Sequence, residues 1–115
     1  SEKSGVMSSF ELDRSCESGP CGMVWNGYLN IPRSGGYQFW TESDDGSTLS
    51  IDNDMVVNND GDHGMEEKTG FANLQQGWHR IKVVYFNSGG GSGLKVWYAP
   101  AGKEKTAIPG DALAH

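Results

Sequence analysis

Hydrophobic and polar residues alternate over short segments of this chain, and turn-forming residues separate the segments about every 8–12 positions. Alternation with a period of two places apolar side chains on one face of a β-strand, whereas an amphipathic helix repeats about every 3.6 residues. No stretch of the chain follows the helical period. The pattern therefore predicts one all-β domain, an antiparallel β-sandwich.

The same pattern locates the individual strands. We expect strands at residues 23–31, 37–43, 47–52, 55–58, 71–74, 78–86 and 94–98. Asn53 and Asp54 form a predicted tight turn. The most polar stretch, residues 58–70, is expected to form a long loop or a loose strand. In the C-terminal tail, Ile108 and Leu113 are the side chains expected to tether the chain to the core.

Length and charge limit the partners. The chain has 115 residues, of which 15 are acidic and 9 basic, and a net charge of −6. This acidic balance disfavours nucleic acids and anionic membrane surfaces, which select for patches of Lys and Arg. No apolar run reaches the about 18–20 residues that cross a bilayer. We therefore expect no nucleic-acid partner and no membrane insertion, and either a cation or a neutral molecule as ligand.

Two cysteines indicate the compartment. Cys16 and Cys21 stand in the segment CESGPC, and the Gly-Pro turn between them permits a disulfide, which would stabilise the fold by about 2 kcal/mol. Free thiols are the alternative, while zinc is disfavoured because a second cysteine pair is missing. A disulfide implies an oxidising compartment, so we expect an extracellular protein, either secreted or on a cell surface.

Two adjacent carboxylates, Asp44 and Asp45, stand at a predicted strand end in the segment SDDGS. They repel each other, and a divalent cation removes that penalty; Ca²⁺ suits them because it takes about six to eight oxygen ligands in flexible geometry. To aim both carboxylates at one ion the backbone must bend sharply, for example at a cis peptide bond. A solvated turn is the alternative, and on these residues alone it is the commoner explanation.

Two further segments contain oxygen ligands. Asn87 opens a glycine-rich segment, residues 87–93, in which an amide oxygen and main-chain carbonyls could approach a ligand; a flexible hairpin loop is the alternative. Asn58, Asp60, Gly61 and Glu67 approximate the spacing of a calcium loop, but predicted strands rather than helices flank them. We expect a polar turn in that second segment.

Catalytic motifs are missing from the sequence. Asp, His and Ser all occur, but no nucleophile elbow or other hydrolase motif brings them together. His63 and His79 are too isolated to form a zinc site. The glycine-rich segment also lacks the features of a phosphate-binding loop. We therefore expect a binding module rather than an enzyme.

An ordered series of segments resembles a known family. The series is WNGYLNIPRSGGYQFWTESDDGSTLSIDNDMVV, NNDGDHG, LQQGWHRIKVVYFNSGGGSGLKVWY and the closing IPGDALAH. From about Val24 to His115 the chain is similar to the protective-antigen-type domain, also called the PA-fourteen domain. The resemblance implies a β-sandwich of jelly-roll character. It also implies that members with the paired-Asp loop, which include yeast flocculins, epithelial adhesins and bacterial surface adhesins, are calcium-dependent lectins.

The resemblance implies a ligand set as well. In those lectins two consecutive Asp residues joined by a cis peptide hold the calcium, and here they match Asp44 and Asp45. An Asn from a second loop matches Asn87, and main-chain carbonyls match positions near Gly89 and Gly91. Neighbouring hydroxyls of the sugar complete the calcium shell. The implied sugar-binding residues therefore include Asp44, Asp45 and Asn87.

Three other side chains are candidates for sugar contacts. His63 could donate a hydrogen bond to the sugar, and Trp40 or Trp97 could stack on it. For both tryptophans we favour a place in the core.

The N-terminal segment departs from the family pattern. Many members begin with a further strand or two, where this chain has the atypical residues 1–22. We treat residues 1–115 as one domain, expected to be part of a larger multidomain protein. Its predicted function is calcium-dependent glycan binding in cell adhesion or as a carbohydrate-binding module. The alternative is a non-catalytic structural or protein-interaction domain.

Overall fold

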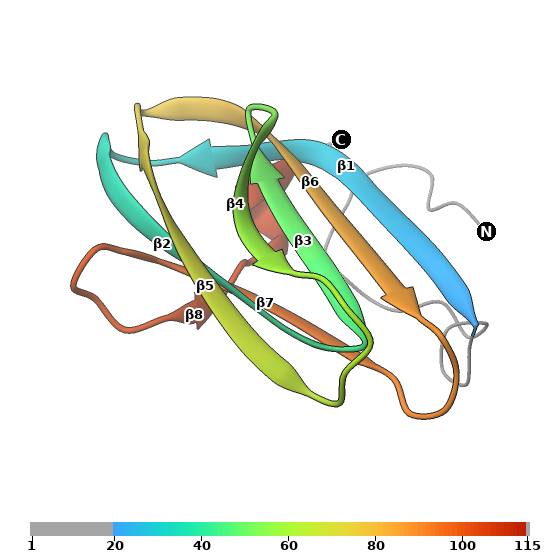
Figure 1. Ribbon diagram of the computed structural model, residues 1–115. Helices are drawn as coiled ribbons and strands as arrows, with labels where there is room; N and C mark the ends of the chain where they lie inside the picture. The colour runs from blue at the N-terminus through green and yellow to red at the C-terminus, as the bar shows by residue number, and fades with distance from the viewer. Residues whose placement is uncertain (1–19, 115) are drawn as a thin grey trace.

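The computed structural model describes residues 20–114, and in this part of the chain nearly every element is a β-strand (Figure 1). The strands are β1 (Cys21–Ile31), β2 (Gly35–Asp44), β3 (Gly46–Ile51), β4 (Asp54–Asn59), β5 (Glu66–Leu74), β6 (Gly77–Asn87), β7 (Gly93–Pro100), β8 (Thr106–Ala107) and β9 (Leu113–Ala114). A short 3-10 helix, η2 (Gly110–Ala112), precedes β9. No helix among these residues is long and apolar enough to cross a membrane.

The strands form two antiparallel sheets that pack against each other (Figure 1). The five-stranded sheet has the order β4-β3-β6-β1-β9, and the four-stranded sheet has the order β5-β2-β7-β8. Since β2 and β3 follow each other in sequence but belong to different sheets, the chain crosses the sandwich between them. The predicted antiparallel β-sandwich is confirmed.

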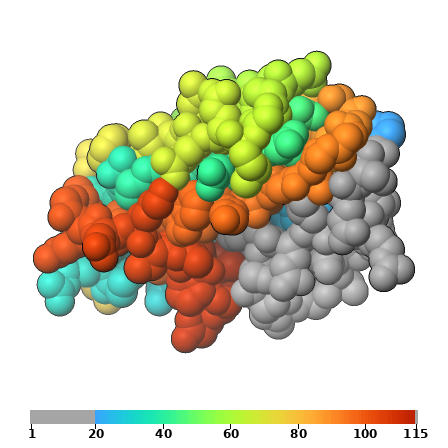
Figure 2. All heavy atoms as spheres, turned by 90° about the horizontal axis from the view of Figure 1, so that it is seen from below, coloured from blue at the N-terminus to red at the C-terminus, as the bar shows by residue number. Residues whose placement is uncertain are grey.

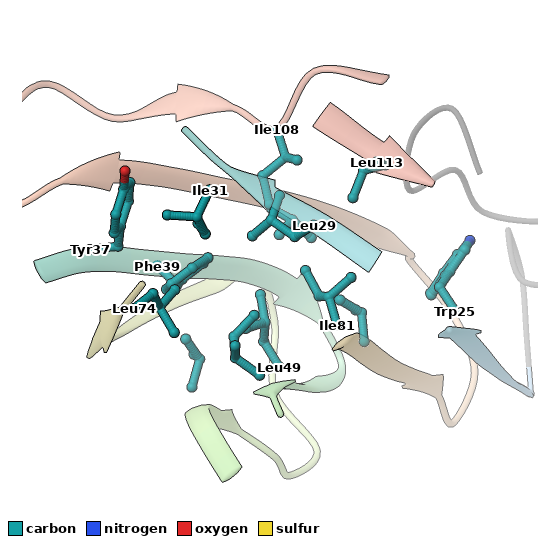
Figure 3. Packing of buried hydrophobic residues seen from close by; sticks show 14 of the residues in the cluster. Trp25, Leu29, Ile31, Tyr37, Phe39, Leu49, Leu74, Ile81, Ile108 and Leu113 are labelled. Atoms are coloured by element: carbon teal, nitrogen blue, oxygen red, sulfur yellow. The ribbon is translucent and has the colours of Figure 1, made fainter. Parts of the chain in front are cut away.

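The core lies between the sheets and follows the alternation of the sequence (Figure 3). On β6, Ile81 and Val83 point inward and are at most 1% exposed. Phe39 of β2 is fully buried on the opposite layer. Ile108 and Leu113 are also buried in this cluster, so the predicted tethering of the C-terminal tail is confirmed.

The strand registers bring several connections to one end of the sandwich. On one side of β6, Phe86 pairs with Gly46, the first residue of β3. On β2, the last residue, Asp44, pairs with Gly93, which begins β7. One end of the sandwich therefore brings together the last residues of β2 and β6 and the first residues of β3 and β7. The last residue of β6 is Asn87.

Two predictions of local structure are wrong in detail. The turn before β4 is formed by Asp52 and Asn53, with φ angles of 52° and 72°, one residue earlier than expected. The predicted loop at 58–70 is reduced to residues 60–65, because β4 continues to residue 59 and β5 begins at residue 66. β5 is an edge strand whose main chain bonds to β2 and whose side chains are mostly exposed. Such a strand needs no apolar alternation.

The N-terminal predictions fall mostly outside the described residues. Cys21 begins β1, whereas Cys16 is not among the described residues, so the disulfide between them stays a prediction. Of the atypical segment 1–22, the structure describes only residues 20–22.

His79 connects two turns at the start of β6. Its Nδ1 lies 2.6 Å from Oδ2 of Asp52, and its Nε2 lies 2.6 Å from the main-chain oxygen of Gln75. Both partners accept hydrogen bonds, and only the protonated imidazolium can donate from both nitrogens. The Asp52 carboxylate, together with the Gln75 carbonyl, accordingly raises the pKa of His79.

We expect the stabilisation provided by His79 to depend on pH. Because the folded-state pKa is raised, the stabilisation is fully present below the unfolded pKa of about 6.5 and is lost as the pH rises through the folded value. Urea unfolding should show a larger difference in free energy between wild type and His79→Gln at about pH 5.5 than at about pH 8.5. Equal differences at the two pH values would contradict this role.

Gly70 allows the two sheets to approach along one side of the sandwich, where β4 and β5 run side by side (Figure 1). A Cβ atom at this position would lie 1.7 Å from the main-chain oxygen of Val56. Gly70→Ala should therefore lower the free energy of unfolding by about 1–3 kcal/mol or more. The matched control is Gly64→Ala, whose Cβ would meet nothing within 4 Å and which should change stability by less than about 0.5 kcal/mol. Equal effects of the two substitutions in urea unfolding would refute this.

Candidate functional site

Asp45 is the single residue between β2 and β3, and the peptide bond that joins it to Asp44 is cis. This bond agrees with the arrangement that the paired-Asp resemblance implies. The hydroxyl of Ser43 donates to the main-chain oxygen of Asp45 at 2.9 Å, which fixes the backbone on the inner side of the junction.

The carboxylate of Asp45 joins three connections of the fold. Ser88, just after β6, donates to Oδ2 from its main-chain N–H at 2.8 Å and from its hydroxyl at 2.9 Å. His63, in the β4–β5 connection, donates its main-chain N–H to Oδ1 at 3.1 Å. In Figure 2 the β2–β3 junction accordingly lies between the yellow-green β4–β5 connection and the orange β6–β7 connection.

These donors keep Asp45 ionised. The main-chain N–H of Ser88 is the largest cause that lowers the pKa of the Asp45 carboxyl, and the Ser88 hydroxyl and the His63 N–H lower it further. The residue is only 7% exposed, and burial acts in the opposite direction. Donated hydrogen bonds stabilise the carboxylate more than burial penalises it, so Asp45 presents a fixed negative charge.

Asp44 is held by its main chain, while its carboxylate lies beside the glycine-rich connection. The hydroxyl of Tyr85 donates to the main-chain oxygen of Asp44 at 2.5 Å. A Cβ atom built on Gly91 would lie 3.3 Å from Oδ2 of Asp44. The absence of a side chain at Gly91 therefore lets its backbone approach this carboxylate closely.

Asn87 completes the group from the end of β6. It is 1% exposed, and its Oδ1 accepts a hydrogen bond from the main-chain N–H of Gly89 at 3.1 Å. This contact orients the amide and shapes the first turn of the β6–β7 connection. The ligands that the resemblance implies thus lie in or beside two connections that meet at one end of the sandwich. They are Asp44, Asp45, Asn87, Gly89 and Gly91.

A cluster of buried polar side chains lies beneath the junction. Ser47 donates to Oγ1 of Thr41 at 2.9 Å, and its hydroxyl lies 2.7 Å from that of Ser43. The amide of Asn59 donates to the main-chain oxygens of Glu66 at 2.7 Å and Thr41 at 3.2 Å. These side chains occupy inward positions, so the core changes from apolar to polar as it nears the site.

His63 is bound within its own connection. Its Nδ1 lies 2.8 Å from the main-chain oxygen of Gly64, and its Nε2 lies 3.0 Å from that of Asn59. The bond to Gly64 is the largest cause that raises the pKa of His63. The structure therefore engages both ring nitrogens with the main chain and places the His63 N–H on Asp45; a sugar contact from this ring stays a prediction.

The core position expected for the two tryptophans is wrong. Trp40 and Trp97 form a cross-strand pair and are half-buried on the outer face of the four-stranded sheet, because the inward positions there belong to Phe39 and Val96. The ammonium of Lys105 lies 4.0 Å from the ring centroid of Trp97 and 5.5 Å from that of Trp40. Trp40 precedes Asp44 by four residues, which is about 13 Å along a strand, and its sugar contact stays a prediction.

The alternative calcium segment does not form a loop of ligands. Asn58 belongs to β4, and Glu67 belongs to β5, where it pairs with Lys105. Asp60 accepts a hydrogen bond from Gly61 in the connecting turn. The expected polar turn covers only the middle of this segment.

The oxygen atoms at the junction fit a hard cation. Across residues 20–114, no group of three or more His, Cys, Asp or Glu side chains could hold a metal ion. A metal at the junction would therefore bind two carboxylates and take its other ligands from amide and main-chain oxygens. That set excludes the nitrogen and sulfur ligands that zinc prefers and suits calcium. Gly91, with no side chain beside Asp44, leaves room for such an approach.

Sequence reasoning missed the residues that hold the carboxylates in place. Ser88 supplies two of the donors to Asp45, and Tyr85 bonds the backbone of Asp44. The available signal was the polar identity of Thr41, Ser43 and other inward positions near the strand ends. Polar residues at inward positions indicate a buried hydrogen-bond network.

Comparison with known proteins agrees with this fold. The family model described as the PA14 domain matches residues 18–111. No curated protein sequence matches the chain.

Solved structures provide the closer comparison. The PA14 sugar-binding domain from an RTX adhesin is 25% identical with a TM-score of 0.75, and the match covers 82% of this chain and 54% of that chain. The PA14 domain of the MpAFP antifreeze protein is 18% identical with a TM-score of 0.75, covering 81% and 50%. The Epithelial Adhesin 6 A domain from Candida glabrata, in complex with Galb1-3GlcNAc, is 11% identical with a TM-score of 0.68, covering 82% and 50%. The chain thus spans about half the length of these structures.

We expect Ser88→Ala to raise the pKa of Asp45 towards its ordinary value. The substitution removes the hydroxyl donor but keeps the main-chain N–H, so the pKa should remain below the ordinary value of about 3.9. Carbon-detected NMR titration of the Asp45 carboxyl in the presence of chelator measures the change. Ser92→Ala, in the same connection, is the control and should leave the pKa of Asp45 unchanged. A shift of equal size in both variants would argue against the assigned bond.

Proposed function

The chain belongs to the PA14 domain family, and we propose that it binds glycans through a calcium ion held at the junction of Asp44 and Asp45. The observation that carries the proposal is the arrangement of the two carboxylates. Asp45 is kept ionised by Ser88 and His63, and the carboxylate of Asp44 lies against the backbone at Gly91.

Electrostatics favours a divalent cation at this position. Two adjacent carboxylates in a partly buried site repel each other, and that repulsion costs stability unless a positive charge compensates it. The amide oxygen of Asn87 and the main-chain oxygens near Gly89 and Gly91 would supply further neutral ligands. Ca²⁺ would contribute open coordination positions that accept neighbouring hydroxyls of a sugar.

The exchange of ligands limits the affinity. A sugar hydroxyl at such a position replaces a water molecule with a chemically similar oxygen, so each contact gains little. We expect dissociation constants of about 10⁻⁴–10⁻³ M for a monosaccharide. Display of several copies would increase the apparent affinity by avidity, which suits an adhesin or a carbohydrate-binding module in a larger protein.

The similar structures support glycans as the partners. The RTX adhesin domain, with 25% identity, is named as a sugar-binding domain. An adhesin-like role would take place outside the cell or on its surface, which is also the compartment expected from Cys16 and Cys21. The alternative is a non-catalytic structural or protein-interaction domain, for which the connections at the junction would be ordered without a sugar ligand.

We expect Asp44→Asn and Asp45→Asn each to weaken calcium binding by at least about 100-fold, because each removes one of two charged ligands. Asn87→Ala should weaken it by about 10–100-fold. The matched control is Asp62→Asn, an exposed carboxylate of the β4–β5 connection, which should have less than about a twofold effect. Isothermal titration with CaCl₂ measures the affinities.

A glycan array tests the sugar. The wild type should bind in the presence of CaCl₂, and binding should disappear with excess chelator and in both Asp variants. Binding that persists in chelator would overturn the role of calcium. A blank array with calcium present would favour the alternative interaction domain.

A further inference from the structure

The outer face of the five-stranded sheet carries two neighbouring cations. Because Ile81 and Val83 point inward on β6, alternation turns Trp78, Arg80 and Lys82 to the outer face. Arg80 and Lys82 are both exposed. They stand two residues apart on one face, which separates their Cα atoms by about 7 Å.

The strands on either side of β6 do not neutralise these cations. On β1, Tyr28 pairs with Arg80, and Asn26 pairs with Lys82. On β3, Ser50 pairs with Lys82. Like charges on one sheet face destabilise unless an acidic neighbour compensates them, and these three cross-strand partners are neutral.

The carboxylate beside Arg80 is already engaged. Asp52 accepts the main-chain N–H of Arg80 at Oδ1 and contacts His79 at Oδ2. The ion pairs among the described residues accordingly involve neither the guanidinium of Arg80 nor the ammonium of Lys82. Within residues 20–114, neither charge has an ion-pair partner, in a chain whose net charge is −6.

The same side chains line two neighbouring hollows, which together are called the groove here. One hollow of about 240 Å³ is lined by Asn26, Ser50, Asn53, Arg80 and Lys82. A second hollow of about 310 Å³ is lined by Asn26, Gly27, Tyr28 and Arg80. Asn26 and Arg80 border both hollows, so the two are neighbours on the face formed by β3, β6 and β1, which lie side by side in Figure 1.

We propose that this groove binds a polysaccharide that carries carboxylate groups, a polyuronate. The planar guanidinium of Arg80 matches a carboxylate with two parallel hydrogen bonds. In a uronic acid the carboxylate is attached directly to the sugar ring, so the cation must stand beside the group that stacks on the ring. Tyr28, directly opposite Arg80 and 42% exposed, has that position.

The neutral lining completes the recognition. Asn26 and Asn53 present amides, and Ser50 presents a hydroxyl. These groups can donate to and accept from sugar hydroxyls. A groove with cations alone would accept any anion, whereas amides and an aromatic ring next to the cations favour a carbohydrate.

The acidic surface elsewhere does not prevent this binding. Screening at physiological salt reduces interactions beyond about 8 Å, so distant carboxylates add little to the potential at Arg80 and Lys82. Lys82 precedes Asn87 by five residues, about 17 Å along β6, which separates the groove from the Asp44–Asp45 junction. Nucleic acid fits poorly, because its affinity comes largely from the neutralisation of many phosphates by Lys and Arg and the groove offers two cations.

The test uses oligogalacturonate as the probe and excess chelator throughout, so that any calcium-dependent glycan binding at the junction is abolished. Wild-type protein should bind the probe in isothermal titration, and binding should weaken as salt is raised. Arg80→Gln/Lys82→Gln should lose at least about tenfold in affinity. Tyr28→Ala should lose about 2- to 10-fold. Thermal unfolding should show that each variant remains folded.

Two controls make the result specific. Lys95→Gln/Lys103→Gln removes the same amount of charge from other exposed positions and should change the affinity less than about twofold. Methyl-esterified oligogalacturonate has the same backbone without charge and should not bind. Absence of wild-type binding, equal losses in the two double variants, or equal binding of the esterified probe would overturn the proposal. Tighter binding of dextran sulfate with the same number of charges would overturn the assignment to carboxylates.

Discussion

Asp45 carries the chain from one sheet to the other as a single residue, and its carboxylate is 7% exposed. A buried charge must be satisfied by donors from the protein. Those donors come from Ser88 after β6 and from His63 between β4 and β5. One carboxylate therefore requires three connections to meet at the same end of the sandwich. The same bonds that satisfy Asp45 also keep it charged, so the structural requirement and the proposed chemistry of the site have one cause.

The inner side of β2 shows how the core gives way to the site. Phe39 packs in the apolar cluster, whereas Thr41 and Ser43, two and four residues later on the same face, join a hydrogen-bonded network with Ser47. Polar groups inside a protein are tolerated when they form hydrogen bonds, as the hydroxyls of Thr41, Ser43 and Ser47 do here. This network supports the crossing from beneath, while Tyr85 fixes the main chain of Asp44. The junction of Asp44 and Asp45 is thus anchored by packed strands, which would reduce the ordering cost of binding a ligand there.

The two proposed binding surfaces use opposite charges and different parts of the sandwich. At the strand ends, turns bring carboxylates and main-chain oxygens together, an arrangement suited to a hard cation. On the outer face of the five-stranded sheet, the period of two aligns Arg80 with Lys82 and leaves neutral neighbours on both sides. Their separation along β6 exceeds the screening length at physiological salt. Each surface can therefore act without the other, and together they would let one small domain contact two positions on a glycan.

The sequence by itself determined which face of most strands is buried, because alternation is a local property that each strand carries independently. It also identified Asp44, Asp45 and Asn87 as neighbours of strand ends, and the structure joins Asp44 to Asp45 by a cis bond. The sequence did not indicate that Ser88 and Tyr85 hold the two aspartates in place. It wrongly favoured a core position for Trp40 and Trp97, and it predicted only residues 71–74 of β5. These features depend on which strands pair and on which sheet each strand joins. An edge strand held by main-chain bonds leaves no apolar pattern, and only the tertiary structure decides which connections converge on one carboxylate.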